Sequence, residues 1–251
     1  MCIGNTSIID NFLTEEECDN LLSMTNVSPP QGAGRVIQME SRTSASNRVR
    51  SGDTSLRRST TWYVRYAAPQ VVPLLRAAAD LLPSISVKQM EEVQLVRYQG
   101  ETQGFGWHED ALDEGEVTSL VGGQRIATLL VYLDECRDGR TLFRDLRGSN
   151  NKRLGVSPQK GRALLFFPAI TKPTMLSESA LNIDFGDPRW TFGSTYFDGT
   201  MADHRTAHAG EPPSGETNGG RKHIAQLWIH SLEHTPVVFG RGLNRHEEVR
   251  L

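Results

Sequence analysis

Four segments of the chain carry the apolar pattern of β-strands. They cover residues 93–99, 125–134, 162–167 and 222–230, and each is bounded by glycine, proline or charged clusters. Short strands that follow one another without intervening helices favour a sandwich or barrel over a parallel α/β sheet. The second half of the chain is therefore predicted to form a β-rich core.

The N-terminal part has a different pattern. Residues 7–13 indicate a short strand, and Thr14 followed by Glu17 is a capping-box signature that predicts a helix through about Met24. Apolar positions at helical spacing over 61–82, with Pro69 in or near the first turn, predict a second helix. We expect both helices to support the sheet.

Three segments break these patterns. Residues 35–58 hold six arginines against Glu40 and Asp53 and predict a loop, either a basic loop that meets an acidic substrate or a solvated, mobile one. Residues 111–123 predict an acidic loop. Residues 168–203 form a long insertion, which predicts a lid or a substrate wall because it is rich in aromatic residues, among them Trp190, Phe192, Tyr196 and Phe197.

Composition adds bounds to this picture. The 251 residues are 37% hydrophobic and 23% charged, as in a globular protein, and we expect a single domain over 1–251. Within it, residues 1–90 are predicted to be a helical support region, 91–232 the core and 233–251 a C-terminal tail. The net charge of -3 gives no reason to expect nucleic acid or a membrane as a partner.

The three cysteines, Cys2, Cys18 and Cys136, are too few and too scattered for a disulfide framework. The N-terminus lacks the basic start and apolar stretch of a signal peptide, and no apolar run reaches membrane-spanning length. A reducing, cytoplasmic location is the expectation. No pattern indicates the oligomeric state.

A candidate metal site begins at His108 and Asp110. Residues two apart on a strand project to one side, so these side chains converge while Glu109 points away. A second histidine further along the chain, His208, completes a set of two imidazoles and one carboxylate, which leaves open positions on the ion as in non-haem Fe(II) oxygenases. The alternative second histidine is His204.

From about residue 93 to 230 the sequence resembles the prolyl 4-hydroxylase type of Fe(II)/2-oxoglutarate dioxygenase. The pieces that carry the resemblance stand in the family's order at 95–98 (LVRY), 108–110 (HED), 124–128 (QRIAT), 139–143 (GRTLF), 160–167 (KGRALLFF), 208–210 (HAG) and 222–228 (KHIAQLW). The resemblance implies a mainly β fold with flanking α-helices, a double-stranded β-helix or jelly roll supported by N-terminal helices.

The same resemblance implies roles for individual residues. His108, Asp110 and His208 would be the catalytic Fe(II) ligands. Lys222 would bind the distal carboxylate of 2-oxoglutarate, and the alternative is an exposed charge at a strand edge. On a strand Lys222 shares a face with Ile224, Gln226 and Trp228, and a lysine that faces an apolar lumen needs an anion. Three further residues match the family, namely Tyr98 and Thr141 in the 2-oxoglutarate pocket and Arg125 facing the substrate.

The implied reaction is oxidative decarboxylation of 2-oxoglutarate to succinate and CO2, coupled to C–H hydroxylation with O2 as co-substrate and ascorbate as reductant. The substrate is either a prolyl residue of a peptide or protein, or a free amino acid or other small metabolite. Two other classes stay open: a catalytically silent metal-binding jelly-roll protein, and a cupin-like metalloenzyme that does not use 2-oxoglutarate. Asp110 argues against a halogenase, because the related halogenases have lost this carboxylate to make room for chloride.

Overall fold

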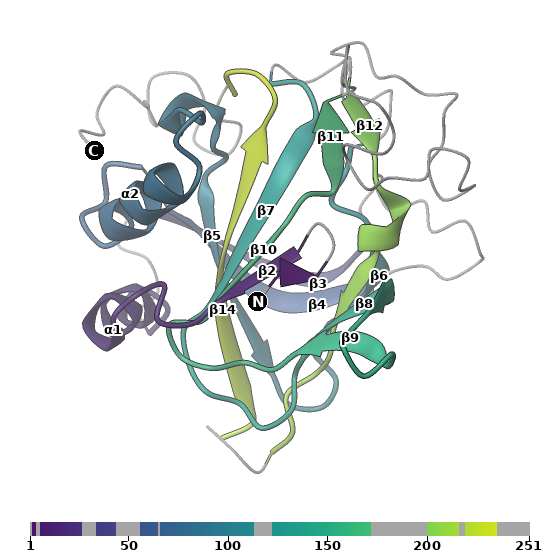
Figure 1. Ribbon diagram of the computed structural model, residues 1–251. Helices are drawn as coiled ribbons and strands as arrows, with labels where there is room; N and C mark the ends of the chain where they lie inside the picture. The colour runs from purple at the N-terminus through teal and green to yellow at the C-terminus, as the bar shows by residue number, and fades with distance from the viewer. Residues whose placement is uncertain are drawn as a thin grey trace.

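The computed structural model describes residues 2–3, 6–26, 34–43, 56–64, 66–112, 122–171, 200–215 and 219–234, with the backbone alone for 2–3, 34–43, 56 and 171. These ranges are rich in strands (Figure 1). The helices are α1 (Glu15–Ser23) and α2 (Val72–Leu81), with short 3-10 helices at Val87–Gln89 and His204–Thr206. The strands are β1 (Cys2–Ile3), β2 (Thr6–Ile9), β3 (Gly34–Thr43), β4 (Leu56–Val64), β5 (Val93–Gln99), β6 (Phe105–His108), β7 (Arg125–Tyr132), β8 (Thr141–Arg147), β9 (Arg153–Val156), β10 (Ala163–Phe166), β11 (Ala169–Thr171), β12 (Thr200–Ala202), β13 (His208–Gly210) and β14 (Arg221–His230).

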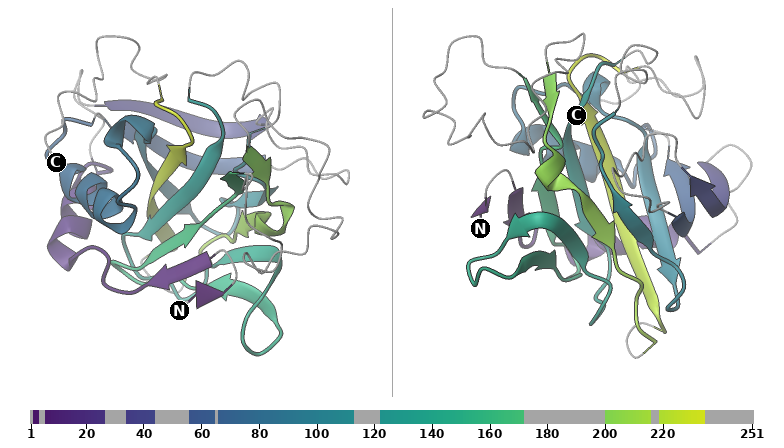
Figure 2. Two further views of the ribbon diagram at one scale, coloured as in Figure 1. Left: turned by 45° about the horizontal axis from the view of Figure 1, so that its top comes forward. Right: turned by 90° about the vertical axis from the view of Figure 1, so that its right-hand side faces the viewer.

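Twelve strands form one sheet, and β11 and β12 form a separate pair. The order across the sheet is β1-β2-β10-β7-β14-β5-β4-β6-β13-β8-β9, and β3 pairs with β4 off this path. The sheet curves until it is nearly barrel-shaped, which confirms the expected mainly β jelly roll (Figure 2). Strands distant in the sequence thereby come to line one lumen.

The sheet has an apolar layer on each side. Leu95 and Leu129 face outward and pack in one cluster with Leu21 of α1 and Leu75 of α2, so the two helices cover one flank of the sheet (Figure 1). The alternate positions on β5, beginning with Val96 and Tyr98, belong to a second cluster inside the lumen. This two-sided burial explains why β7 and β10 are nearly continuous apolar runs.

The start of α1 is fixed by the predicted capping box. The Thr14 backbone N–H donates to Glu17 Oε2 over 2.8 Å, and the Glu17 N–H donates to Thr14 Oγ1 over 3.2 Å. The reciprocal bonds satisfy N–H groups that the first helical turn leaves unpaired.

The prediction of a helix over 61–82 was wrong for its first part. Residues 61–64 continue β4, and α2 begins only at Val72, with Pro73 in its first turn. Thr61, Trp62 and Val64 are β-branched or aromatic side chains, which favour a strand that is half buried against neighbours. Local strand propensity therefore prevailed over the weak helical spacing.

The predicted loop over 35–58 was also wrong where the structure describes it. Residues 34–43 form β3, and β4 begins at Leu56; residues 44–55 lie outside the described residues. The N-terminal 90 residues thus contribute strands to the sheet as well as supporting helices. The register pairs Arg35 with Tyr63 and Arg42 with Arg57, so the arginines did not prevent strand pairing.

The other predicted elements are confirmed with small changes at their ends. Strands were predicted at the positions of β2, β5, β7, β10 and β14. The insertion over 168–203 begins with β11 and returns through β12, which pair with each other. Three segments lie outside the described residues: the aromatic-rich segment 172–199, residues 113–121 of the acidic loop and the tail 235–251. The lid therefore stays a prediction.

Cys18 and Cys136 are buried and form no disulfide within the described part of the chain. No helix within the described ranges combines the length and the apolar character that crossing a membrane requires.

Candidate metal centre

Strand pairing brings the predicted ligands together. His108 at the end of β6 lies directly opposite His208 at the start of β13, and Asp110 follows β6 by two residues. One ligand atom from each of the three residues lies within 4.8 Å of the other two, and all three side chains are buried. The strand itself ends at His108, so the chain bends between the two ligands of the His-x-Asp motif.

The hydrogen bonds of the two imidazoles orient their second nitrogens toward the carboxylate. His108 Nδ1 lies 2.8 Å from the Gly106 carbonyl, and His208 Nδ1 lies 3.0 Å from the Thr206 carbonyl. A carbonyl only accepts, so each Nδ1 carries the proton and each Nε2 keeps its lone pair. The two Nε2 atoms lie 3.6 and 3.7 Å from the Asp110 oxygens.

The donor set therefore fits a divalent ion. His108 Nε2 is fully buried and has no hydrogen-bond partner among the described residues, which is costly unless a Lewis acid takes the lone pair. Two neutral imidazoles and one carboxylate on one side of an ion leave its other side open for small ligands. The assignment of these residues as metal ligands stays a prediction that this geometry supports.

Aromatic rings and one hydroxyl hold the ligands in place. Phe105 stacks on His108 with ring centroids 3.5 Å apart, and Phe166 meets His208 edge-on at 4.8 Å.

Burial, together with His208, lowers the pKa of His108 to about 3, so its imidazole is neutral at neutral pH. Burial acts to raise the pKa of Asp110, but the adjacent histidines, the nearby Arg125 and a hydrogen bond from Thr128 hold it below its usual value.

His204 is separate from this cluster. Its Nδ1 lies 2.7 Å from Glu109 Oε2. Glu109 thus points away from the ligand atoms of His108 and Asp110, as strand alternation predicts. Of the two candidate histidines, His208 is the one that the geometry favours.

Lys222 lies directly across from Tyr98 in the β5–β14 pair and is 1% exposed. Its ammonium lies 4.6 Å from the centroid of the Tyr98 ring and donates to the carbonyls of Gly139, over 2.9 Å, and Glu211, over 2.8 Å. These acceptors are neutral, and burial lowers the pKa of Lys222 to about 8. A buried ammonium held by neutral carbonyls is suited to receive an anion.

The loop at Gly139 permits this arrangement. Gly139 has a φ of +79°, and a Cβ there would lie 3.1 Å from Lys222 Cδ, so a side chain would disturb both the turn and the lysine. Arg140 next to it forms a two-point ion pair with Glu211, over 2.8 and 3.1 Å. The pair fastens the two segments whose carbonyls hold Lys222.

Thr141 and Tyr98 are both buried, and their roles in binding 2-oxoglutarate stay predictions. Thr141 is buried beside β13, opposite Gly210, and the Tyr132 hydroxyl donates to Thr141 Oγ1 over 2.7 Å. Burial raises the pKa of Tyr98, and the Arg57 guanidinium, which is hydrogen-bonded to the phenol, opposes that rise. Tyr98, Thr141 and Lys222 thus lie around one polar region of the lumen.

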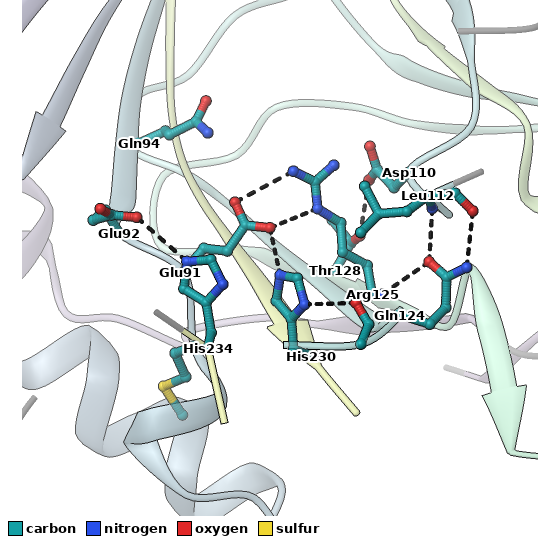
Figure 3. Close-up of polar contacts among 12 residues, drawn as sticks. Glu91, Glu92, Gln94, Asp110, Leu112, Gln124, Arg125, Thr128, His230 and His234 are labelled. Atoms are coloured by element: carbon teal, nitrogen blue, oxygen red, sulfur yellow. Dashed lines mark hydrogen bonds and ion pairs between the residues drawn. The ribbon is translucent and has the colours of Figure 1, made fainter. Parts of the chain in front are cut away.

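Arg125 is embedded in a polar network at the other end of the lumen (Figure 3). Its guanidinium donates to both oxygens of Glu91, over 2.6 and 3.3 Å, and lies 3.8 Å from the Trp228 ring centroid. Glu91 also lies 2.7 Å from His230 Nε2. Although burial acts to raise the pKa of Glu91, Arg125 and His230 bring it well below its usual value, so Glu91 is charged and fixes Arg125.

Sequence reasoning missed two residues of the lumen. Thr128 stands in the quoted family piece but was given no role, and its hydroxyl donates to Asp110 Oδ2 over 2.8 Å. Arg57 was assigned to the basic loop, yet it lies buried beside Tyr98. The available signal was the polar alternation of Arg57, Ser59 and Thr61, three residues on one face of a strand.

Comparisons with known proteins agree with this geometry. The model of the 2OG-Fe(II) oxygenase superfamily matches residues 93–230. Prolyl 4-hydroxylase 5 of Arabidopsis thaliana is 30% identical over 174 residues, which are 64% of this chain and 56% of the relative. A putative prolyl 4-hydroxylase of Acanthamoeba polyphaga mimivirus is 29% identical over 166 residues, 64% of this chain and 60% of the relative. The chain thus spans a little over half the length of these curated relatives.

Solved structures resemble the fold. A viral collagen prolyl hydroxylase from Paramecium Bursaria Chlorella virus-1, in a 2OG complex, matches with a TM-score of 0.53 and 20% identity over 91% of this chain and 97% of that one. A Trichoplax adhaerens prolyl hydroxylase, in complex with a hypoxia inducible factor peptide fragment, matches with a TM-score of 0.54 and 16% identity over 90% and 84% of the two chains.

Proposed function

We propose a function from one premise: the chain belongs to the 2OG-Fe(II) oxygenase superfamily. That membership implies Fe(II) as the metal and 2-oxoglutarate as a co-substrate. The proposed activity is hydroxylation of an unactivated C–H bond, coupled to conversion of 2-oxoglutarate and O2 into succinate and CO2. The observation that carries the proposal is the buried cluster of His108, Asp110 and His208 in a lumen that also holds the unneutralised ammonium of Lys222.

Each residue of the chain has a physical task in this proposal. His108, Asp110 and His208 would hold Fe(II), which supplies the oxidising chemistry when it is bound. Lys222 would bind the distal carboxylate of 2-oxoglutarate in place of part of its water shell, with Tyr98 and Thr141 as polar neighbours. Phe105, Phe143 and Phe166 exclude water from the ligands because they pack around the two imidazoles.

For the primary substrate we favour a prolyl side chain in a peptide. The support is the similarity to prolyl 4-hydroxylases, one of which has a peptide fragment in its structure. A free amino acid or other small metabolite is the second candidate. A catalytically silent protein is disfavoured because the ligand set and Lys222 are both intact.

Two accessory features belong to the same proposal. Ascorbate is proposed as the reductant that keeps the iron ferrous. A reducing, cytoplasmic location is proposed because Cys18 and Cys136 form no disulfide within the described ranges.

The test is succinate formation by the purified chain with Fe(II), 2-oxoglutarate, ascorbate and O2. Proline-rich peptides and free amino acids are then screened by mass spectrometry for the addition of one oxygen atom. Hydroxylation of a peptide supports the favoured substrate. Hydroxylation of a small molecule with every peptide unmodified would reject that substrate and keep the reaction class, whereas absence of succinate under all conditions would reject the activity.

A further inference from the structure

The lumen contains a second buried cation, Arg57 of β4, which is 7% exposed. All three guanidinium nitrogens meet neutral side-chain oxygens: Nε lies 3.2 Å from Ser59 Oγ, Nη2 lies 3.4 Å from Thr61 Oγ1, and Nη1 lies 3.5 Å from Gln94 Oε1. The fourth partner is the neutral phenol of Tyr98. These distances are long for hydrogen bonds from a charged donor, which ordinarily measure about 2.7–2.9 Å to an anionic oxygen.

Such surroundings do not neutralise a guanidinium. Arg57 forms no ion pair with a carboxylate anywhere in the described ranges. A buried charge is strongly destabilising unless an opposite charge accompanies it. The other lumen arginine, Arg125, shows the contrast because it is paired with Glu91. Arg57 is therefore poised for an anion that comes from outside the described chain.

The position of Arg57 places that anion next to the metal centre. Its guanidinium carbon lies 5.1 Å from the centroid of the Phe105 ring, and Phe105 stacks on His108. Along β5 the lumen-facing positions are Tyr98, Val96 and Gln94, of which Tyr98 lies opposite Lys222 and Gln94 opposite Gln226. Because Nη1 of Arg57 reaches Gln94, the guanidinium extends along the lumen, from the end that holds Lys222 toward the end that holds Arg125.

The charges of the lumen indicate which molecule brings the anion. The two positive charges of a divalent metal ion are balanced by the two negative charges of the 2-oxoglutarate carboxylates. Of the described chain, Lys222 and Arg57 are cations and Asp110 is an anion. His108 and His208 add no charge as metal ligands, because each donates its Nδ1 proton to a carbonyl and would bind the ion through the lone pair of Nε2. One positive charge remains after metal and co-substrate are bound, and one further carboxylate would neutralise it.

We propose that Arg57 receives a carboxylate of the primary substrate. The reacting residue then carries a free carboxylate, either as a free amino acid or as the C-terminal residue of a peptide. This inference rests on the proposed function and narrows its substrate class. An internal prolyl residue, whose carbonyl group is an amide, does not satisfy Arg57.

The test compares matched acid and amide probes: L-proline with L-prolinamide, and glycyl-L-proline with glycyl-L-prolinamide. The kcat/KM of hydroxylation is measured by mass spectrometry, and binding is measured by calorimetry on protein loaded with redox-inert Zn(II) and 2-oxoglutarate. Acids are expected to exceed amides by roughly tenfold or more, the size of one charge-assisted hydrogen bond. The two pairs also distinguish a free amino acid from a C-terminal residue.

Variants assign the preference to Arg57. Arg57→Gln is expected to remove the acid-over-amide preference, and Arg57→Lys to retain part of it. The matched control is Arg58→Gln, because Arg58 is the exposed neighbour on the opposite face of β4. Equal use of acids and amides by the wild type, or a preference that survives in Arg57→Gln, would overturn the proposal. So would a rise in the KM for 2-oxoglutarate as large as the rise for the substrate, because Arg57 would then bind the co-substrate.

A stability measurement needs no substrate. Arg57→Met replaces an unpaired buried charge with an apolar side chain, so its urea midpoint is expected to equal or exceed that of the wild type. A strong loss of stability would mean that Arg57 has a structural partner, and the proposal would fall. Failure of the proposed function has a different signature, since wild-type protein would then form no succinate with any probe.

Discussion

The Thr128 hydroxyl on β7 donates a hydrogen bond to Oδ2 of Asp110 over 2.8 Å. One strand of the sheet thus orients a carboxylate that follows a different strand, β6. Thr128→Val removes this hydrogen bond with little change of shape. We expect metal affinity to fall roughly tenfold, because groups that orient a ligand commonly contribute that much. Titration of metal-free protein measures it. Thr128→Ser, which keeps the hydroxyl, is the control, and equal affinity of the valine variant and the wild type would contradict the assigned role.

The ligand assignment predicts loss of metal binding. His108→Ala, Asp110→Ala or His208→Ala each removes one of three protein ligands, so each is expected to abolish succinate formation and to lower bound metal in equilibrium dialysis. His204→Ala is the matched control, because that imidazole lies against Glu109. Full activity of Asp110→Ala after reloading with Fe(II) would contradict the assignment of these three residues as the metal ligands.

Lys222→Ala is expected to weaken 2-oxoglutarate binding. A charge-assisted bond to a carboxylate that is partly removed from water contributes about 2 kcal/mol or more, equivalent to roughly a thirtyfold higher KM. Titration of 2-oxoglutarate in the succinate assay measures the change. Arg221→Ala, one residue earlier and exposed, is the control. If the KM for 2-oxoglutarate rises in this variant and not in Lys222→Ala, Arg221 and not Lys222 binds the carboxylate.

The same lysine predicts a pH dependence of 2-oxoglutarate binding. Burial lowers the pKa of Lys222 to about 8 in the protein without ligand. Only the protonated ammonium attracts the carboxylate, so affinity is expected to be full below that pH and to fall as the pH rises through it, by up to roughly tenfold per unit. Calorimetric titrations from about pH 7 to about pH 9 test the sign. Affinity that increases over this range would be incompatible with a cationic Lys222.

The capping box of α1 predicts a stability effect far from the lumen. Thr14→Ala removes the acceptor of the Glu17 N–H and is expected to lower the free energy of unfolding by about 1 kcal/mol. Urea denaturation followed by circular dichroism measures it. Thr14→Ser keeps the acceptor and is expected to behave like the wild type.

The parts of the fold that the sequence predicted are those with two-sided burial. β5, β7, β10 and β14 are buried along most of their length because one face packs on the helices and the other faces the lumen, and β7 and β10 are accordingly almost wholly apolar. β3 and β4 were both missed. The polar positions of β3 and of the first half of β4 obscure the apolar alternation, and the second half of β4 was assigned to a helix because its apolar residues continue the helical spacing of α2. Burial of Arg57 depends on what neighbouring strands place beside it, which local sequence does not encode.

The candidate metal ligands were predictable from the sequence, whereas the residues that orient the groups around them were not. His108, Asp110 and His208 were found because their spacing and family pattern are distinctive, and the structure brings them together. The roles of Thr128 and Glu91 arise from strands that meet only after folding, as in the Glu91–Arg125 pair, whose members are 34 positions apart. In the sequence alone, a threonine or a glutamate in such a strand cannot be distinguished from an ordinary core or surface residue.

The pairing of β2 with β10 limits how the chain can be shortened. Residues 6–9 cover one edge of β10, whose own sequence, Ala163 to Phe166, is wholly apolar. The family match begins only at residue 93, and a fragment cut there would leave that edge open to pair with other chains. Expression of residues 93–230 alone should therefore give aggregates, so the unit that folds is larger than the unit that homology recognises.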